Sequence, residues 1–337
     1  MKVFITGATG FVGSHTALAL LAAGHECHLL VRNIAAAQAY FQQHSQQQPQ
    51  YIVADMLDSE TVKAAMLGFD AVVHAAALVD LDPRHAEQTL EGNLQGITSV
   101  IGSACELGIK KILYVSSVSV MMHTDKAWVD ESSALITSKD AYSASKIACE
   151  QQVRGYQVAG YPVAITYPGG VIGPDDPKLS QVNDALLEML MIMVPLTTSG
   201  IQLVDVRDLA QLQKQLLESD VFSEKENARY IIGGNFVPWA DIAKALVESA
   251  SIKPRCIKIP GWGLRLCGTV MDLLRCFIHV DVPMTVESTH IATKSPQFSS
   301  AKIAALMEVS FRPSFESIKD TCQWLESSGR IATRQSR

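Results

Sequence analysis

The sequence predicts an α/β protein built on a doubly wound parallel sheet, together with a smaller, mostly C-terminal α/β region. Two observations lead to this fold class. Short runs rich in β-branched residues alternate with helix-like stretches through the first half of the chain, and these runs are apolar throughout. Alternating strands and helices favour a parallel sheet covered on both faces, and strands that are buried on both faces lack apolar–polar alternation.

The expected strands and helices follow one another in a regular order. Strands are predicted at residues 3–6, 28–31, 51–54, 71–74, 112–116 and 163–167, and helices between them at residues 13–23, 59–66, 93–107 and 143–159. These helices are followed by Gly24, Gly68, Gly108 and Gly160. We expect the four glycines to adopt the left-handed conformation that closes many helices.

The regular alternation of predicted strands and helices ends after residue 174. Scattered strands are predicted at residues 201–206, 230–233 and 256–259, without strict alternation with helices. We therefore expect residues 1–174 to form one domain, to which some strands from about 201–233 return, and residues 175–328 to form mainly a second region. The polar residues 329–337 are expected to be a mobile tail, and the glutamine-rich residues 42–50 to form a loop.

Composition narrows the class of protein. The chain has 337 residues, of which 48% are hydrophobic, and a formal net charge of -6, which does not favour nucleic-acid binding. Its seven cysteines form no CxxC pair, so we expect reduced packing thiols in the cytoplasm and no metal site.

Two stretches, residues 185–195 and 261–283, are the most apolar. Both contain charged residues, and a membrane-spanning helix needs ~20 mostly apolar residues, so no integral membrane segment is expected. The second stretch could lie on a membrane surface, although a buried helix of the C-terminal region is the preferred interpretation.

A glycine-rich turn joins the first predicted strand to the first predicted helix. The segment TGATGFVG occupies residues 6–13. Glycine turns let backbone N–H groups approach a pyrophosphate, and the helix N-terminus adds partial positive charge. The turn therefore predicts dinucleotide binding by Gly7, Thr9, Gly10, Phe11, Val12 and Gly13.

The ends of three further strands add to this prediction. The second strand ends at Arg32, where NAD(H)-binding proteins place an acid against the ribose 2′-hydroxyl. A guanidinium would instead pair with a 2′-phosphate, so NADP(H) is favoured and NAD(H) stays an alternative. After the third strand, Asp55 could accept a hydrogen bond from the adenine amino group, with Met56 packed on the ring. Small residues after the fourth strand would leave room for ribose and phosphates: Ala75, Ala76 and Ala77.

A tyrosine and a lysine lie one helical turn apart in the segment YSASK. Tyr142 and Lys146 share one helix face, and a nearby ammonium lowers the pKa of a tyrosine. Such a tyrosine can donate a proton to a ketone oxygen or accept one from an alcohol. Ser116 and Ser117 end the fifth strand, where a hydroxyl could hold the substrate oxygen.

With these motifs the chain resembles the extended short-chain dehydrogenase/reductases, the NAD-dependent epimerase/dehydratase superfamily, which are built on a Rossmann-type domain. Its nearest branch contains dihydroflavonol 4-reductase-like and 3β-hydroxysteroid dehydrogenase-like enzymes. The matching segments cover nearly the whole chain: TGATGFVG, YVSS (114–117), YSASK (142–146), PGGVIGP (168–174), LVDVRDLA (203–210) and FRPSFESIKDTCQWL (311–325).

The resemblance implies roles for individual residues. Ser117, Tyr142 and Lys146 would form the catalytic triad, and Tyr142 and Lys146 would also contact the cofactor. Asn93, expected to open a helix, would steady the site, and Ser119 is a lesser alternative to Ser117. Tyr167 departs from the family, which usually has arginine before the proline. A homodimer or a monomer is implied. Residues expected near the nicotinamide are Pro168, Gly169 and Val171, and Val115 and Gly170 are also expected to contact the cofactor.

These expectations combine into one leading function: an NADP(H)-dependent oxidoreductase that reduces a ketone or aldehyde to an alcohol, or the reverse, on a small, fairly apolar substrate. Candidate pocket segments are residues 79–83, residues 121–128 and a predicted helix over residues 185–195. Met189, Met191 and Met193 would form an adaptable wall of this pocket or ordinary core. Few basic residues lie near these segments, which disfavours a nucleotide-sugar substrate. The alternatives are a sugar-nucleotide epimerase or dehydratase with tightly bound NAD(P), and a non-catalytic dinucleotide-sensing protein.

Overall fold

The computed structural model of the protein describes residues 1–78, 85–138, 141–275 and 285–331. Its largest sheet has seven strands in the order β11-β7-β5-β4-β1-β2-β3, and all neighbouring strands are parallel. The predicted doubly wound parallel sheet is confirmed. Its strands are β1 (Lys2–Thr6), β2 (Glu26–Val31), β3 (Gln50–Val53), β4 (Ala71–His74), β5 (Lys111–Val115), β7 (Val163–Pro168) and β11 (Arg229–Ile232).

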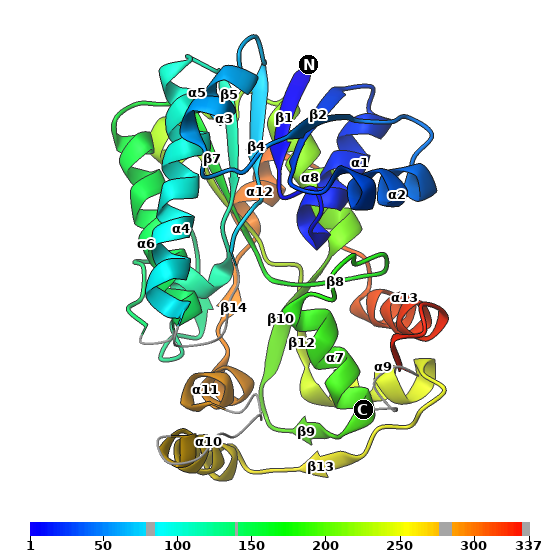
Figure 1. Cartoon of the computed structure of the whole chain (residues 1–337). Helices are drawn as coiled ribbons and strands as arrows, with labels where there is room; N and C mark the ends of the chain where they lie inside the picture. Colours follow the sequence, from blue (N-terminus) through cyan, green and yellow to red (C-terminus); the bar gives the residue numbers. More distant parts are fainter. Residues whose placement is uncertain (79–84, 139–140, 276–284, 332–337) are drawn as a thin grey trace.

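Helices cover both faces of this sheet (Figure 1). Neighbouring residues of one strand, Phe4 and Ile5, are both fully buried, each in a different core cluster on opposite faces. This double burial explains why the strand sequences are apolar throughout. One face packs against α1 (Phe11–Ala22), α2 (Ile34–His44) and α8 (Val206–Glu218). The other packs against α3 (Ser59–Ala65), α4 (Ala86–Ile97), a π-helical turn η2 (Thr98–Gly102), α5 (Ser103–Glu106) and α6 (Ala141–Val158).

The predicted helix ends are confirmed in their backbone geometry. Gly24, Gly68, Gly108 and Gly160 have φ angles of +82°, +77°, +69° and +86°. Helix α2 was not expected, because its alanine- and glutamine-rich segment buries only Ala37 and Phe41 and shows little periodicity. The loop expected over residues 42–50 is therefore shorter than predicted, because α2 ends at His44 and β3 begins at Gln50.

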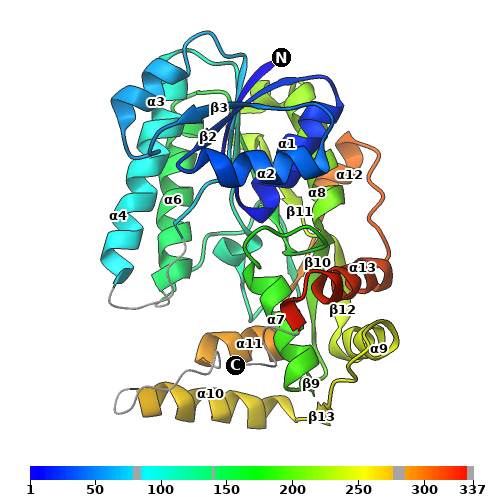
Figure 2. The same cartoon turned by 45° about the vertical axis from the view of Figure 1, so that its right-hand side comes forward.

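The smaller region has its own core on the carboxyl side of the large sheet (Figure 2). One small sheet contains β8 (Gly170–Ile172), β10 (Gly200–Asp205) and β12 (Asn235–Pro238), and two-stranded sheets pair β9 (Val194–Leu196) with β13 (Cys256–Lys258) and β6 (Trp128–Val129) with β14 (Gln297–Phe298). The remaining helical segments are η3 (Val118–Met121), α7 (Gln181–Met191), η4 (Val221–Asn227), α9 (Trp239–Ser249), α10 (Gly261–Arg275), α11 (Val286–Lys294), α12 (Ala301–Leu306) and α13 (Ser314–Ser327).

Two expectations for the later part of the chain need correction. The helix expected over residues 185–195 ends at Met191, and the chain then forms β9, because Pro195 disfavours a helical residue before it. The mobile tail does not begin at Gly329: Arg330 donates to the carbonyl of Asp176 at 3.0 Å, and Ile331 is buried in the core of the smaller region. Residues 332–337 lie outside the described residues.

Burial also accounts for most of the cysteines that the structure describes. Cys27, Cys105, Cys149 and Cys322 are buried, and burial raises the pKa of the Cys27 thiol to about 12. Within the part of the chain that the structure describes, none of the helices combines the length and apolarity of a transmembrane span.

Candidate active site

The glycine turn lies at the carboxyl ends of β1 and β4, where the order of strands along the chain reverses direction. This is the usual ligand-binding crevice of an open parallel sheet. Gly7 has φ of +76°, and a Cβ there would lie 2.5 Å from the backbone nitrogen of Ala76. A Cβ on Gly13 would lie 2.4 Å from the carbonyl oxygen of Gly7. Both positions therefore require glycine so that the turn, α1 and the segment after β4 can pack closely.

The N-terminus of α1 is open to an anion. Its N-cap is Gly10, no side chain caps its first N–H groups, and its first turn contains no acidic residue. The N–H of Gly10 itself donates to the carbonyl of Gly7 at 2.8 Å, which fixes the turn. An uncapped helix N-terminus behind a glycine turn fits the pyrophosphate of a dinucleotide.

A buried threonine–histidine pair connects the end of β1, where the glycine turn begins, to the end of β4. Thr6 Oγ1 and His74 Nδ1 lie 2.7 Å apart, and the N–H of Ala76 donates to Thr6 Oγ1 at 3.4 Å. Burial, reinforced by the nearby Lys146 ammonium, lowers the pKa of His74 to about 3. His74 is therefore neutral at ordinary pH. The effect of Lys146 on its pKa indicates that the ammonium lies near the end of β4.

The predicted adenosine-side residues stand at the ends of β2 and β3. Arg32 is exposed, and it has no carboxylate partner among the described residues. Asn33 caps α2 by accepting from the N–H of Ala36 at 3.3 Å. Asp55 is exposed and accepts from the N–H of Leu57 at 3.0 Å, and Met56 packs against α4 at Gly96.

The serine-bearing turn follows β5. Ser117 is half-buried, and its Oγ accepts from the N–H of Ser119 at 3.1 Å, which leaves its hydroxyl proton available to another acceptor. The hydroxyl oxygens of Ser116 and Ser119 are buried and have no hydrogen-bond partner in the described structure.

Helix α6 carries the YSASK segment and packs against η3, the turn that follows Ser117. The backbone of Tyr142 lies in the first turn of α6, but its side chain lies outside the described part of the structure. Lys146 follows one turn later and is half-buried. The contact between α6 and η3 brings the YSASK helix beside the serine turn.

Asn93 joins three segments of this site. Its amide accepts from the N–H of Leu78 at 2.7 Å, donates to the carbonyl of Leu78 at 3.0 Å, and donates to Ser145 Oγ at 3.0 Å. The expectation that Asn93 opens its helix is wrong, because α4 begins at Ala86. Its central position in α4 lets it tie the segment after β4 to the YSASK helix.

A buried ionic cluster that sequence reasoning missed lies below Lys146. Glu150 is 0% exposed and accepts from Tyr167 Oη at 2.5 Å and from Arg154 Nε at 2.8 Å. Burial and the Glu150 carboxylate raise the pKa of Tyr167, so its hydroxyl stays protonated. Tyr167, which stands where the family usually has arginine, thus shares this carboxylate with Arg154. The i, i+4 spacing of Glu150 and Arg154 was the available signal.

The segment expected near the nicotinamide joins the two parts of the molecule. Pro168 ends β7 and is buried, and Gly170 and Val171 begin β8 and are half-buried. A Cβ on Gly169 would lie 2.4 Å from the carbonyl oxygen of Gly233, so only glycine fits there. Val115 ends β5 and is buried.

The described parts of the predicted pocket segments differ in burial. Residues 79–83 lie outside the described residues. Met121 is fully buried, whereas Trp128 is 64% exposed. Met189 and Met191 pack against the core of the smaller region, as ordinary core residues do.

Two segments that carried the family resemblance, LVDVRDLA and FRPSFESIKDTCQWL, are joined by hydrogen bonds and ion pairs. The N–H of Arg312 donates to Asp208 Oδ2 at 2.7 Å, and its guanidinium also contacts Asp208. Arg207 pairs with Asp205 and Asp320, both at 2.7 Å. The segment FRPS is therefore tied to LVDVRDLA at the start of α8.

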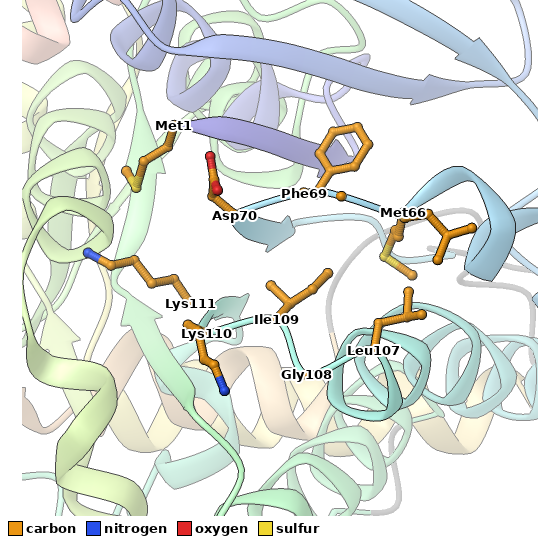
Figure 3. A pocket seen from close by; sticks show the side chains of 11 residues that line it. Met1, Met66, Phe69, Asp70, Leu107, Gly108, Ile109, Lys110 and Lys111 are labelled. Atoms are coloured by element: carbon orange, nitrogen blue, oxygen red, sulfur yellow. The ribbon is translucent and has the colours of Figure 1, made fainter.

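A separate cavity lies at the opposite edge of the large sheet (Figure 3). It has a volume of about 580 Å³, and Met1, Asp70 and Lys111 line it just before or at the start of β1, β4 and β5. Because ligands of open parallel sheets bind at the carboxyl ends of strands, this cavity is distinct from the candidate site.

Comparison with known proteins agrees with this geometry. A candidate dihydroflavonol 4-reductase of Synechocystis sp. is 23% identical over 98% of this chain and 96% of its own length. A 4-hydroxy-2-methyl-3-oxo-4-farnesyl-3,4-dihydroquinoline-1-oxide ketoreductase of Stigmatella aurantiaca is 33% identical over 55% of each chain. The crystal structure of gox2253 superimposes with a TM-score of 0.82 and 28% identity, over 98% of this chain and 99% of that one.

The model of the NAD dependent epimerase/dehydratase family matches residues 3–233, which include the glycine turn, the serine turn and the YSASK helix. The expected resemblance is thus confirmed, as is an enzyme that acts on CH–OH or C=O groups with a nicotinamide cofactor. The chain belongs to the NAD-dependent epimerase/dehydratase family.

Proposed function

We propose that this enzyme is an NADP(H)-dependent reductase that converts a fairly apolar ketone or aldehyde to an alcohol, or catalyses the reverse reaction, with Ser117, Tyr142 and Lys146 as its catalytic residues. The observation that carries the proposal is the meeting of three segments at one sheet edge. The glycine turn, the Ser117 turn and the segment held by Asn93 against α6 all lie at the carboxyl ends of β1, β4 and β5.

The residues present fit a dinucleotide. The uncapped N-terminus of α1 would hold the pyrophosphate, Arg32 the 2′-phosphate, and Asp55 with Met56 the adenine. Ala75, Ala76 and Ala77 would pass beside the ribose, and Pro168 to Val171 with Val115 beside the nicotinamide. When bound, the cofactor supplies or accepts the hydride.

The protein's own part in the reaction is the movement of one proton. The hydroxyl of Ser117, already fixed by the N–H of Ser119, donates a hydrogen bond to the substrate oxygen. Lys146 lies one helical turn from Tyr142 on α6, and an ammonium at this spacing would favour the phenolate form of the tyrosine. Tyr142 then gives its proton to the oxygen that becomes the alcohol, or takes it back in the oxidation.

The substrate class rests on chemistry near the site. Two of the similar proteins are named for a dihydroflavonol and for a farnesylated quinoline, both with large apolar parts. Among the described residues 121–128 and 185–195, Lys126 is the only basic residue besides His123, so a diphosphate would find few partners. A sugar-nucleotide epimerase remains the second candidate, because the family description includes that activity.

Net consumption of NADPH separates these two functions. Purified enzyme is mixed with NADPH and a panel of apolar ketones, and in parallel with UDP-sugars. We expect one NADPH oxidised for each alcohol formed with at least one ketone. Interconversion of UDP-sugar epimers without net NADPH oxidation would contradict the proposal.

The choice of cofactor is tested at Arg32. Arg32→Ala removes hydrogen bonds to a charged phosphate, each worth about 1.5–3 kcal/mol, so the Kd for NADPH should rise roughly 10- to 100-fold. The Kd for NADH should stay unchanged, and Arg255→Ala, an exposed arginine on the approach to β13, serves as the control. Equal losses of affinity for NADPH and NADH would show that Arg32 does not bind the 2′-phosphate.

A further inference from the structure

Helix α10 has apolar side chains on two opposite sides. On its inner side, Leu264 is 5% exposed, and a Cβ on Gly268 would lie 2.5 Å from Thr289 Oγ1 of α11, so the two helices pack closely. On its outer side, four large side chains face solvent at spacings of four, four and three residues, which places them in one stripe. They are Trp262, Leu266, Val270 and Leu273, which are 68%, 56%, 46% and 62% exposed.

The stripe continues onto the strand that precedes the helix. All three residues of β13 are exposed, and Ile257 is 44% exposed. Only two residues separate β13 from α10. We call Ile257, Trp262, Leu266, Val270 and Leu273 the outer apolar face. Figures 1 and 2 both place β13 and α10 at the end of the molecule farthest from the large sheet.

The charge around this face differs from that of the whole chain. Residues 253–275 contain five basic residues and one acidic residue, a net charge of +4, whereas the whole chain carries -6. Arg255 and Lys258 are exposed and stand directly before the stripe, whereas the Lys253 ammonium donates to the carbonyls of Val247 and Ala250 at the end of α9. An exposed apolar stripe bordered by basic residues is the pattern that binds anionic membrane surfaces.

We propose that the outer apolar face docks onto an anionic lipid bilayer, with its apolar side chains in the headgroup–acyl boundary and Arg255 and Lys258 against lipid phosphates. Trp262 is the residue type that membrane interfaces favour. A second copy of the chain fits less well, because a two-fold contact through this face would bring two segments of charge +4 together. The inference does not depend on the proposed reaction.

Vesicle binding tests this docking directly. The full-length protein is sedimented with vesicles of phosphatidylcholine, with or without phosphatidylglycerol, while Trp fluorescence is recorded. We expect binding to the phosphatidylglycerol vesicles that weakens with added salt, and a blue shift of emission that Trp262→Phe removes. Arg255→Gln together with Lys258→Gln should weaken binding roughly fivefold for each charge removed.

A matched pair of variants distinguishes docking through the outer apolar face from nonspecific binding to vesicles. Leu266→Glu combined with Leu273→Glu should lower vesicle affinity at least about tenfold, because two carboxylates would have to enter the interface. Leu67→Glu changes a leucine of similar exposure, 63%, at the opposite edge of the large sheet, and should bind like the wild type. Unchanged melting temperatures and NADPH affinities establish that each variant is folded.

Three outcomes would overturn the proposal. The first is no binding of the wild type to phosphatidylglycerol vesicles. The second is equal binding by the wild type, the double glutamate variant and the double glutamine variant. The third is a concentration-dependent dimer, detected by sedimentation velocity, that the double glutamate variant dissolves while vesicle binding stays absent.

Discussion

The two ends of the molecule differ in how far their apolar residues are buried. In the large sheet, Phe4 and Ile5 are fully buried on opposite faces, whereas at the far end Trp262 and Leu273 are 68% and 62% exposed. Single exposed apolar residues are common, but a contiguous stripe of them marks a contact surface. The difference indicates that the sheet end is built for stability and chemistry, and the α10 end for contact with something outside the chain.

Charged groups follow the same division. Glu150, behind the candidate site, is 0% exposed and is neutralised by Arg154, whereas Arg255 and Lys258 at the far end face solvent. A buried charge requires a partner, and an exposed one is screened by water and salt. Substitutions of buried residues at the sheet end should therefore lower activity or stability, and substitutions of exposed residues at the α10 end should change neither.

The largest expected effect is on turnover. Tyr142→Phe removes the proposed proton donor and should lower kcat by about 10³-fold, within the range known for general acids, while leaving the Kd for NADPH nearly unchanged. Tyr156→Phe, on the same helix α6, is the control and should retain activity. Substantial turnover by Tyr142→Phe would mean that another group carries the proton.

The next effect is on stability. Arg154→Ala leaves the buried Glu150 with Tyr167 as its remaining partner and should lower the free energy of unfolding by about 3 kcal/mol or more. Lys63→Ala breaks the exposed pair with Glu106, which lies at 2.6 Å, and should cost about 1 kcal/mol at most. Urea denaturation measures both, and similar losses would contradict the distinction between buried and exposed pairs.

His74 should make stability depend on pH. Its pKa is about 3 in the folded protein and ordinarily 6.5, so between these values the unfolded chain binds a proton that the folded chain does not. The free energy of unfolding should therefore fall by about 1.4 kcal/mol per pH unit from this residue as pH drops below 6.5. His74→Asn should lose this slope when urea denaturation is repeated across pH; an unchanged slope would assign it to other groups.

The smallest effect is expected at the far end. Leu273→Glu should change the free energy of unfolding by about 0.5 kcal/mol at most, because the side chain is already 62% exposed. Leu20→Ala, at a fully buried position of α1, should cost about 2–5 kcal/mol. A large loss in Leu273→Glu would mean that the outer apolar face packs within the protein itself.

Much of the sheet end was predictable from sequence because its signals are local. Strands buried on both faces are apolar throughout, and Gly24, Gly68, Gly108 and Gly160 mark helix ends by their conformational freedom. The functional residues of the glycine turn are close together in the sequence, and so are those of the YSASK segment, so that each can be recognised as a short motif. Their positions in the fold follow from the strands and helices that they join.

The remaining features depend on distant parts of the chain. Tyr167 and Glu150 meet only because β7 packs beside α6, which no local pattern encodes. The sequence predicts Asn93 at a helix start because the polar residues before it show weak apolar periodicity, whereas α4 begins at Ala86. The stretch 261–283 was interpreted as buried because it is apolar, but its sequence does not tell which side of α10 meets α11.

Above all, we propose that the carboxyl edge of the large sheet binds a phosphorylated nicotinamide dinucleotide. Titrating the purified protein with NADPH and with NADH, while following the melting temperature and Trp fluorescence, tests it most directly. We predict saturable binding of both cofactors, tighter for NADPH, with stabilisation of about 2.7 kcal/mol at a hundredfold excess over Kd. No stabilisation by either cofactor would contradict the assignment of the site.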